Sequence, residues 1–239
     1  MKIAVFSDVH GNAVALEAVL KDINARNIDL VFCGGDLVGY GAYPNEVIAL
    51  IRKYRIPTIM GNYDEGVGFS RSDCGCAYTD PRMKELGQIS LDWTKKHVDF
   101  ENRSFLRSLL ERVQFSVCGK KILIVHGSPR QINEYLYTDR PEESVLRFFD
   151  NENVDIIICG HTHMPYTRVM GGKCLINAGS VGKPKDGDRR AAYTVVKLTE
   201  SSLETEVIRV EYDVERMAKV IETSGLPGEF AMALRNATG

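Results

Sequence analysis

The 239-residue sequence predicts an α/β fold with a parallel or mixed sheet that helices cover on both faces. Two observations support this class. Short apolar segments alternate with longer segments in which apolar residues recur at helical spacing. The apolar segments also lack the polar alternation of a half-exposed strand, so we expect both faces of the sheet to be buried.

The first 60 residues have the order strand, helix, strand, helix, strand. Residues 2–6 read as a strand that is apolar from Ile3 onward, and Leu16 and Ile23 then share one helical face behind Asn12, a residue type suited to cap a helix. Pro44 suits the first turn of a second helix, where no backbone N–H is needed. After the first strand we expect a helix from residue 12 to 23, a strand at 30–33, a helix at 44–55 and a strand at 56–60.

The alternation of strand and helix segments is interrupted between residues 65 and 80, where glycine and serine are frequent and a loop is expected. The later expected elements are helices at 84–97 and 104–110, strands at 113–117 and 122–125, a helix at 141–150, strands at 156–159, 166–170, 174–176, 192–197 and 204–210, and helix from 214 to 236. A single domain over residues 1–239 is the economical interpretation. Within it, residues 65–111 form an irregular, helical insertion and residues 214–239 a C-terminal helical tail.

The composition and the N-terminal segment argue against long nucleic acids and membranes as partners. Lys and Arg total 30 against 32 Asp and Glu, a formal net charge of −2, which argues against long nucleic acids as substrates. The N-terminal apolar run is too short for a signal peptide or a membrane span, so we expect a cytoplasmic location and no membrane partner. The six cysteines are then expected to be reduced thiols. The C-x-C formed by Cys74 and Cys76 could be half of a metal or redox site, but no second C-x-C or C-x-x-C completes it, so a structural or loop role is favoured.

Metal-competent side chains follow five of the apolar segments, each beside a glycine. In an open α/β sheet such strand ends share one edge, where ligands bind. Pairs such as Asp8 and His10, or His161 and His163, can face the same side if the backbone is extended. The candidate ligands are Asp8, His10, Asp36, Asn62, His126, His161 and His163. The fifth histidine, His97, lies in a helical segment and is expected at the surface.

Seven ligands are too many for one ion. Two divalent ions that share a carboxylate need about that number of ligands. Nitrogen and oxygen ligands without thiolate suit Mn, Fe, Zn, Ni or Co better than Ca or Mg. The sequence therefore predicts two divalent metal ions, manganese among the candidates, and leaves their identity open.

These residues occur in five short motifs whose order resembles that of the calcineurin-like metallophosphoesterases. The motifs are D-x-H at 8–10, G-D at 35–36, G-N-x-D at 61–64, H-G at 126–127 and G-H-x-H at 160–163. The segment 177–180 is similar to a later N-x-G-S motif of the family. Within the family, the chain looks most like the small bacterial and archaeal phosphodiesterase-type members.

The resemblance implies a layered α/β/β/α sandwich with two mixed β-sheets flanked by helices. It implies two ligand sets that share Asp36: Asp8, His10, Asp36 and His163 for one ion, and Asp36, Asn62, His126 and His161 for the other. The implied reaction is metal-dependent hydrolysis of phosphoesters by a hydroxide that bridges the ions, with phosphodiesters or small nucleotide-type compounds as substrates. Catalytic roles are expected for Asp36, Asn62, Tyr63 and Asp64.

Tyr63 departs from the family pattern. Many members have histidine at this position, assigned to bind the substrate or to protonate the leaving group, and a phenol with a pKa near 10 is a poorer acid. We therefore expect the rate to depend steeply on the pKa of the leaving group. Asp64 is expected either to accept a hydrogen bond from a histidine ligand or to stabilise the N-terminus of a helix.

Substrate and reaction class stay open at this level. Arg130, Lys183, Arg189 and Arg190 are candidates for binding a substrate phosphate, and residues 65–80 can form a lid over the metals. A metal-binding scaffold of the same fold, with weak or no catalysis, is the alternative to an enzyme. The sequence does not separate dinucleoside polyphosphates, cyclic nucleotides and phosphomonoesters as substrates, and it leaves the oligomeric state unknown.

Overall fold

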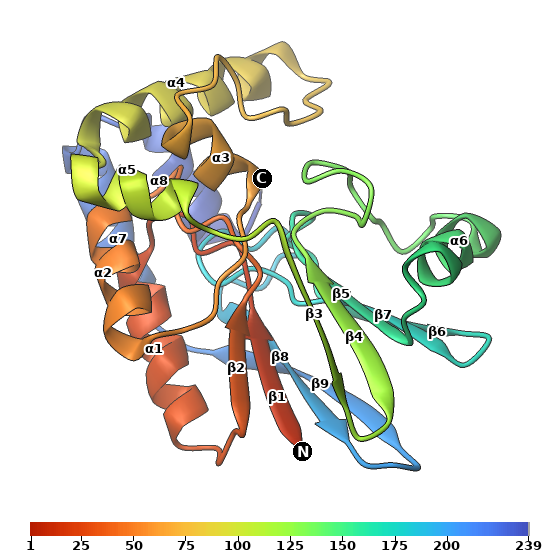
Figure 1. The fold of residues 1–239 in the computed structure, drawn as a ribbon. Coiled ribbons are helices and arrows are strands. Elements are labelled where there is room, and N and C mark those ends of the chain that lie inside the picture. Colours follow the sequence, from red (N-terminus) through yellow and green to blue (C-terminus); the bar gives the residue numbers. More distant parts are fainter. Residues whose placement is uncertain (239) are drawn as a thin grey trace.

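The structure is a computed structural model that describes residues 1–238, and it contains two mixed β-sheets (Figure 1). The four-stranded sheet has the order β2-β1-β8-β9, in which β1 is parallel to β2 and antiparallel to β8. In the register of this sheet, Ile3 lies opposite both Leu30 and Val196. Its strands are β1 (Lys2–Phe6), β2 (Leu30–Cys33), β8 (Ala191–Leu198) and β9 (Leu203–Val210).

The five-stranded sheet has the order β3-β4-β5-β7-β6, with parallel β4, β5 and β7 at the centre and antiparallel strands on both edges. Its strands are β3 (Arg112–Val117), β4 (Lys120–Val125), β5 (Ile156–Cys159), β6 (Tyr166–Met170) and β7 (Lys173–Asn177). The His126 ring donates to the carbonyl of Gly34, so the carboxyl ends of β4 and β2 lie side by side.

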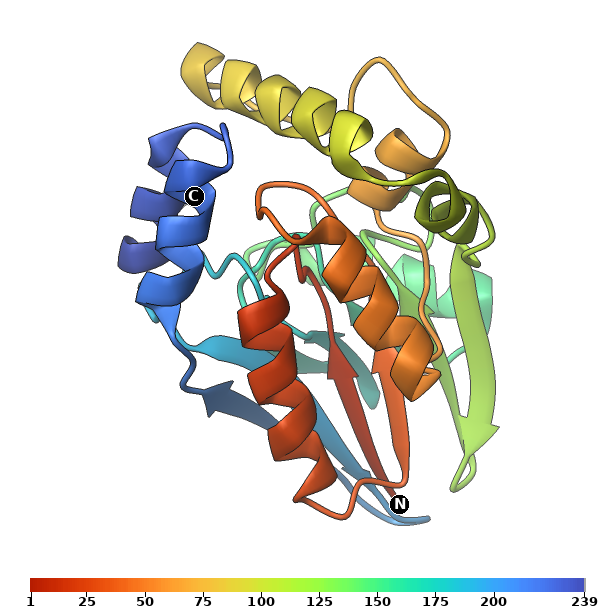
Figure 2. The ribbon, with the colours of Figure 1, turned by 90° about the vertical axis from the view of Figure 1, so that its left-hand side faces the viewer.

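Helices cover the outer faces of both sheets and complete the α/β/β/α layers expected from the sequence. Helices α1 and α2 lie on the four-stranded sheet, and α6 lies on the five-stranded one (Figures 1 and 2). Apolar side chains fill each interface, for example Leu16 under α1, Ile124 between the sheets and Phe149 under α6. These helices are α1 (Ala13–Asn24), α2 (Pro44–Tyr54) and α6 (Glu142–Glu152).

The other helices lie above the strand ends and beside α1. Figure 2 shows α4 across the top of the molecule and the C-terminal helices next to α1. They are α3 (Asn62–Gly68), α4 (Pro81–His97), α5 (Phe100–Arg107), α7 (Val214–Thr223) and α8 (Gly228–Asn236). The helix caps follow the sequence: the Asn12 side chain accepts from the N–H of Ala15 at 3.0 Å, and Pro44 occupies the first position of α2.

Three expected elements differ in the structure. Residues 56–60 form no strand but two isolated bridges, Thr58 with Cys33 and Ile59 with Leu110, because Pro57 has no N–H to donate to a ladder. The segment expected as a loop from residue 65 begins inside α3, which the helix-disfavouring Gly66 had obscured.

The third difference concerns the tail, which is two helices rather than one. Gly225 adopts a φ of +85° after α7, and Pro227 precedes α8. Gly239, the last residue of the expected tail, lies outside the described residues. None of the helices within residues 1–238 is long and apolar enough to cross a membrane. The six cysteines are free.

Candidate metal centre

The seven candidate ligands meet at one edge of the sandwich, where four strands end. Asp8 and His10 follow β1, Asp36 follows β2, Asn62 opens α3, His126 follows β4, and His161 and His163 follow β5. None of the seven residues is more than 4% exposed. Buried titratable side chains are rare unless they are paired or bind a metal, so their arrangement calls for a physical explanation.

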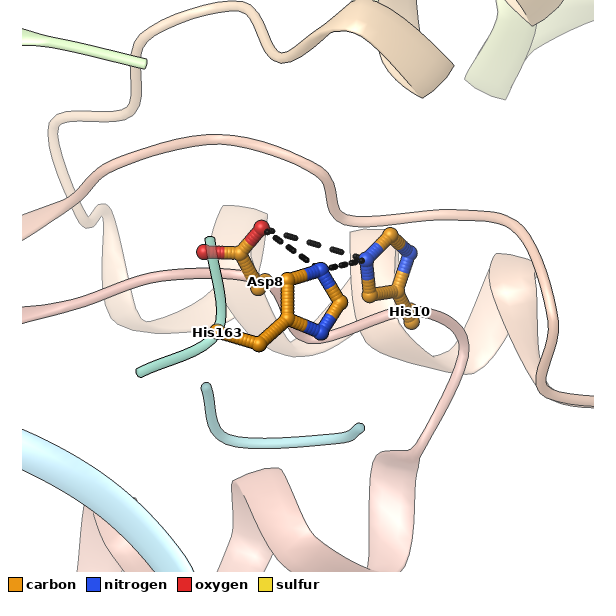
Figure 3. A group of neighbouring side chains, drawn as sticks. All are labelled: Asp8, His10 and His163. Atoms are coloured by element: carbon orange, nitrogen blue, oxygen red, sulfur yellow. Dashed lines mark hydrogen bonds and ion pairs between the residues drawn. The ribbon is translucent and has the colours of Figure 1, made fainter. Parts of the chain in front are cut away.

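Asp8, His10 and His163 form the first group. The two histidine Nε2 atoms lie 3.2 Å apart, and His163 Nε2 lies 3.3 Å from Asp8 Oδ1. Figure 3 shows both rings turning these nitrogens toward the carboxylate. The His10 Nδ1 donates to the carbonyl of Val38 at 3.0 Å, and the His163 Nδ1 donates to that of Lys183. With Nδ1 protonated, each neutral ring presents the Nε2 lone pair to the group.

Asp36, His126 and His161 form the second group. His126 Nε2 lies 3.4 Å from Asp36 Oδ2 and 3.1 Å from the amide oxygen of Asn62. The His126 Nδ1 donates to the carbonyl of Gly34 at 2.8 Å, which turns Nε2 toward these oxygens. Asn62 therefore completes a set of nitrogen and oxygen atoms around this second position.

Asp36 lies between the two groups. Its Oδ2 atom is 3.4 Å from His126 Nε2 and 3.6 Å from His10 Nε2. Its other oxygen, Oδ1, accepts from the N–H of Tyr63 at 2.8 Å, and the N–H of His161 holds Asp8 Oδ2 at 3.0 Å. Backbone donors thus fix both carboxylates, and Asp36 Oδ2 lies within 3.6 Å of a histidine nitrogen of each group.

The donor set fits divalent cations. In the first group, two Nε2 lone pairs and a carboxylate oxygen approach within 4 Å of one another with no donor hydrogen among them, if both rings are neutral. Buried acceptors left without a partner cost about 1–3 kcal/mol each. A cation between them removes that cost, and nitrogen and oxygen ligands without thiolate suit first-row transition ions.

Burial and charge set the protonation of these ligands. Burial lowers the pKa of His10 to about 4 and that of His161 to about 3, so both rings are neutral at pH 7. Burial also raises the pKa of the Asp8 carboxyl to about 7. Burial opposes a charge on His126, but Asp36 outweighs it and raises the pKa of His126 to about 10. Without a metal ion, His126 therefore carries a proton beside Asp36. A cation that binds there would displace this proton.

The backbone at the site is not extended, and this part of the prediction was wrong. The φ angles are 54° at Asp8, 47° at His10, 64° at His161 and 62° at His163, all in the left-handed region. Asp36 joins them at 53°. Such a conformation costs a non-glycine residue about 1–2 kcal/mol and is concentrated at functional sites. Sharp turns after each strand, rather than strand alternation, direct consecutive ligands into one pocket.

Two glycines of the motifs allow the backbone to lie close to the two carboxylates. A Cβ atom on Gly61 would lie 2.1 Å from Asp36 Oδ1, and one on Gly160 would lie 2.5 Å from Asp8 Oδ2. Any larger residue at either position would displace a carboxylate. These glycines therefore fix the positions of Asp36 and Asp8.

Tyr63 has a role other than the one expected, whereas Asp64 takes the second of its two expected roles, at the N-terminus of a helix. The Tyr63 hydroxyl donates to the carbonyl of Gly87 in α4 at 3.4 Å, and its ring is only 1% exposed. Burial raises the pKa of this phenol well above 10, so it is unsuited to protonate a leaving group. The Asp64 oxygens accept from the N–H groups of Leu37 and Gly61 at 2.9 and 3.0 Å, not from a histidine ligand. Asp64 therefore caps α3 and ties it to the loop after β2.

Lys183 is the one candidate phosphate ligand that lies at the centre. It is 6% exposed, and its Nζ lies 4.6 Å from the ring centroid of Tyr40. Arg190 pairs with Asp188 at 2.6 Å, Arg130 pairs with Glu134, and Arg189 is exposed.

Lys185 is a site residue that the sequence analysis missed. Burial lowers its pKa, and the charges of Asp8 and Asp36, one from each group, act in the opposite direction. The signal was a second lysine two residues beyond Lys183. His97 lies outside the site, exposed and stacked on Trp93 at 3.7 Å between ring centroids, as expected.

The segment from residue 69 to 80 contacts the second group. The Asn62 amide nitrogen donates to the carbonyl of Cys74 at 2.9 Å, so its oxygen faces His126. Asn133 donates to the carbonyl of Gly75 at 2.7 Å. Figure 1 shows this segment between α3 and α4, above the strand ends. Asn133 is a further residue that carried no motif and that the sequence analysis missed.

Comparisons with known proteins cover most of the chain or nearly all of it. Residues 1–201 match the calcineurin-like phosphoesterase superfamily domain. An uncharacterized protein of Methanocaldococcus jannaschii is 38% identical in an alignment that covers 94% of this chain and 93% of that protein. The crystal structure of a metallophosphoesterase from Sphaerobacter thermophilus is 30% identical with a TM-score of 0.79, over 99% of both chains. A hypothetical protein of Pyrococcus horikoshii is 23% identical and shares the fold, with a TM-score of 0.84 over 98% of this chain and 97% of that one.

Proposed function

The chain belongs to the calcineurin-like phosphoesterase superfamily, and from this premise we propose that it hydrolyses small phosphodiesters or nucleotide-type phosphoesters with two divalent metal ions. One observation carries the proposal. Two groups of buried metal-competent atoms lie on either side of Asp36, whose Oδ2 atom is within 3.6 Å of a histidine nitrogen of each group. A shared carboxylate between two ions is the arrangement that two-metal phosphoester hydrolysis uses.

The candidate ligands would bind the two ions in two sets. Asp8, His10 and His163 would hold one ion, and Asn62, His126 and His161 the other, with Asp36 shared. When bound, the two ions would lower the pKa of a water molecule between them and offset the charge of the phosphoryl oxygens. The chain's own contribution is to keep these ligands in place through backbone donors and close-packed glycines.

Lys185 is the residue best suited to bind a phosphate oxygen. It is partly exposed, and the charges of Asp8 and Asp36 raise its pKa against the effect of burial. An ammonium group there would attract an anionic substrate and orient it toward the metals, a role that needs only charge. It would not replace the histidine that Tyr63 lacks as an acid, so activity should be greatest with leaving groups of low pKa.

A cavity of about 490 Å³ adjoins His126 and supports a small substrate. Its volume lies within the range of small-ligand sites, roughly 300–1,000 Å³. Three of its arginines are Arg71, Arg107 and Arg112. Arg71 and Arg112 are paired with glutamates, while Arg107 donates to the carbonyl of Gly68 and to a serine hydroxyl. Such a lining would accept an anionic or polar substituent of the ester beyond the reacting phosphate.

The test is metal-dependent turnover of bis(p-nitrophenyl) phosphate. Protein stripped with a chelator and reloaded with Mn²⁺ should hydrolyse the diester, and the Asp36→Asn variant should lose at least about 10²-fold in kcat/KM because the shared ligand loses its charge. Asp150→Asn is the matched control, since Asp150 is exposed on α6. Bound metal without hydrolysis of any ester in a diester and monoester panel would reject the enzyme and favour a scaffold.

A further inference from the structure

Cys74 and Cys76 are not in either group of metal-competent residues, yet they lie beside the second one. Their sulfur atoms are 3.0 Å apart, and both side chains are half-buried around the exposed Gly75. Gly75 adopts a φ of +68°, a turn that brings the two side chains to the same side. From the sequence, a structural or loop role is favoured for this C-x-C over half of a metal or redox site.

One contact joins the pair to Asn62. The Asn62 amide nitrogen donates both to the Cys74 carbonyl at 2.9 Å and to the Cys76 sulfur at 3.2 Å. These two bonds fix the amide so that its oxygen faces His126 at 3.1 Å. The sulfur of Cys76 therefore takes part in orienting a residue of the second metal position.

A second contact joins the same turn to His161. The Asn133 side chain donates to the Gly75 carbonyl at 2.7 Å, and the Asn133 carbonyl lies 3.1 Å from His161 Nε2. A Cβ atom on Gly75 would lie 2.4 Å from the Asn133 amide, which shows how closely the two segments pack. Two ligands of one metal position thus depend on the turn at Gly75.

The first metal position has different supports. The His10 and His163 rings are held by the carbonyls of Val38 and Lys183, and Asp8 is held by the N–H of His161. None of these hydrogen bonds involves residues 74–76. A change in the turn should therefore act mainly on the second position.

We propose that Cys74 and Cys76 are a redox-sensitive dithiol whose conversion to a disulfide weakens the second metal position and leaves the first one intact. This inference rests on the proposed function, because it takes the second position to bind a metal. The oxidant is a small-molecule disulfide, RSSR. One cysteine thiolate attacks it and releases RSH, and the other thiol then displaces the second RSH from the mixed disulfide. Two cysteine S–H bonds are lost, one S–S bond forms, and RSSR is reduced to two RSH.

The structural consequence follows from bond lengths. A disulfide brings the sulfurs from 3.0 Å to about 2.05 Å, so at least one of them moves by several tenths of an ångström or the turn rotates. The Cys76 sulfur then leaves its contact with the Asn62 amide, or the Gly75 carbonyl leaves Asn133. Loss of such an orienting partner typically costs 10–100-fold in metal affinity.

The experiment compares metal binding before and after treatment with glutathione disulfide. Mass spectrometry of peptide fragments should show an intramolecular Cys74–Cys76 bond, detected as the loss of two hydrogen atoms. Equilibrium dialysis against Mn²⁺ should show tight binding of both ions to the reduced protein and about 10-fold weaker binding of one ion to the oxidised protein. Dithiothreitol should restore the tight binding of that ion. In the Cys74→Ser/Cys76→Ser variant the affinity should be the same before and after treatment.

The matched control is Cys118→Ser, because Cys118 lies in the turn between β3 and β4 and should leave the response unchanged. A treated protein without the Cys74–Cys76 bond would overturn the inference. So would a protein that forms the bond and still binds both ions with unchanged affinity. A reduced protein that binds no metal while the disulfide still forms would reject the proposed function and, with it, the coupling.

Discussion

Replacing Gly61 with alanine should displace Asp36 and weaken the metal centre while the fold persists. The φ of Gly61 is −94°, a value that alanine adopts without strain, so the effect is steric. The new Cβ atom would lie 2.1 Å from Asp36 Oδ1 and 2.2 Å from Asp36 N, whereas ordinary contact begins at 3.4 Å. The shared carboxylate must therefore move by about 1 Å from its present place.

The size of the effect follows from this displacement. A misplacement of about 1 Å costs on the order of 10²-fold in rate, which corresponds to about 2.7 kcal/mol of transition-state stabilisation. Overpacking at a buried position costs a further 1–3 kcal/mol or so of folding stability. Gly61→Ala should consequently show about 100-fold lower kcat/KM toward bis(p-nitrophenyl) phosphate, reduced metal content after dialysis and a lower Tm.

Gly228→Ala is the matched control. Gly228 opens α8, and a Cβ atom there meets nothing within 4 Å. This variant should keep its metal, its kcat/KM and a Tm equal to or above that of the wild type. A Gly61→Ala protein with full metal content and wild-type kcat/KM would refute the reasoning, because the close contact at Asp36 would then not be needed.

Three further outcomes are expected. Tyr63→Phe should lower the free energy of unfolding, measured in a denaturant melt, by at most about 1.5 kcal/mol. It should leave kcat/KM unchanged across a series of leaving groups, and a changed slope of kcat/KM against leaving-group pKa would restore Tyr63 as the acid. Because the pKa of His126 is raised to about 10, a metal ion must displace its proton. The apparent metal affinity should therefore rise about tenfold per pH unit from pH 7 toward pH 10. A pH-indicator titration that detects no proton release on metal binding would contradict this. Lys185→Ala should raise KM for anionic esters about 10-fold more than the exposed-residue control Lys96→Ala, and equal KM values would remove Lys185 from the site.

Apolar periodicity predicted most of the fold because burial dictates it. Runs such as 3–6 and 156–159 are buried on both faces, and their pattern admits few alternatives. The prediction failed where local residues compete with tertiary contacts. Pro57 limited an apolar segment to isolated bridges, and Gly66 lies inside a helix that Asp64 caps.

The candidate ligands were predictable because each is a metal-competent residue at a strand end. Their backbone was not, since left-handed φ angles at Asp8 and His163 depend on contacts from distant loops. Tyr63 was expected at the substrate from its place in a motif, but packing against α4 buries its hydroxyl. Asn133 belongs to no motif, so only the folded chain identifies it, and the one signal for Lys185 was its position two residues beyond Lys183.

The stoichiometry of bound metal tests the central claim most directly. Equilibrium dialysis of the reduced protein against Mn²⁺, followed by elemental analysis, should give two ions per chain for the wild type and one for His126→Asn. The exposed-histidine control His97→Asn should keep two. A wild type that binds no ion, or a His126→Asn variant that binds as many ions as the wild type with the same affinity, would contradict the account.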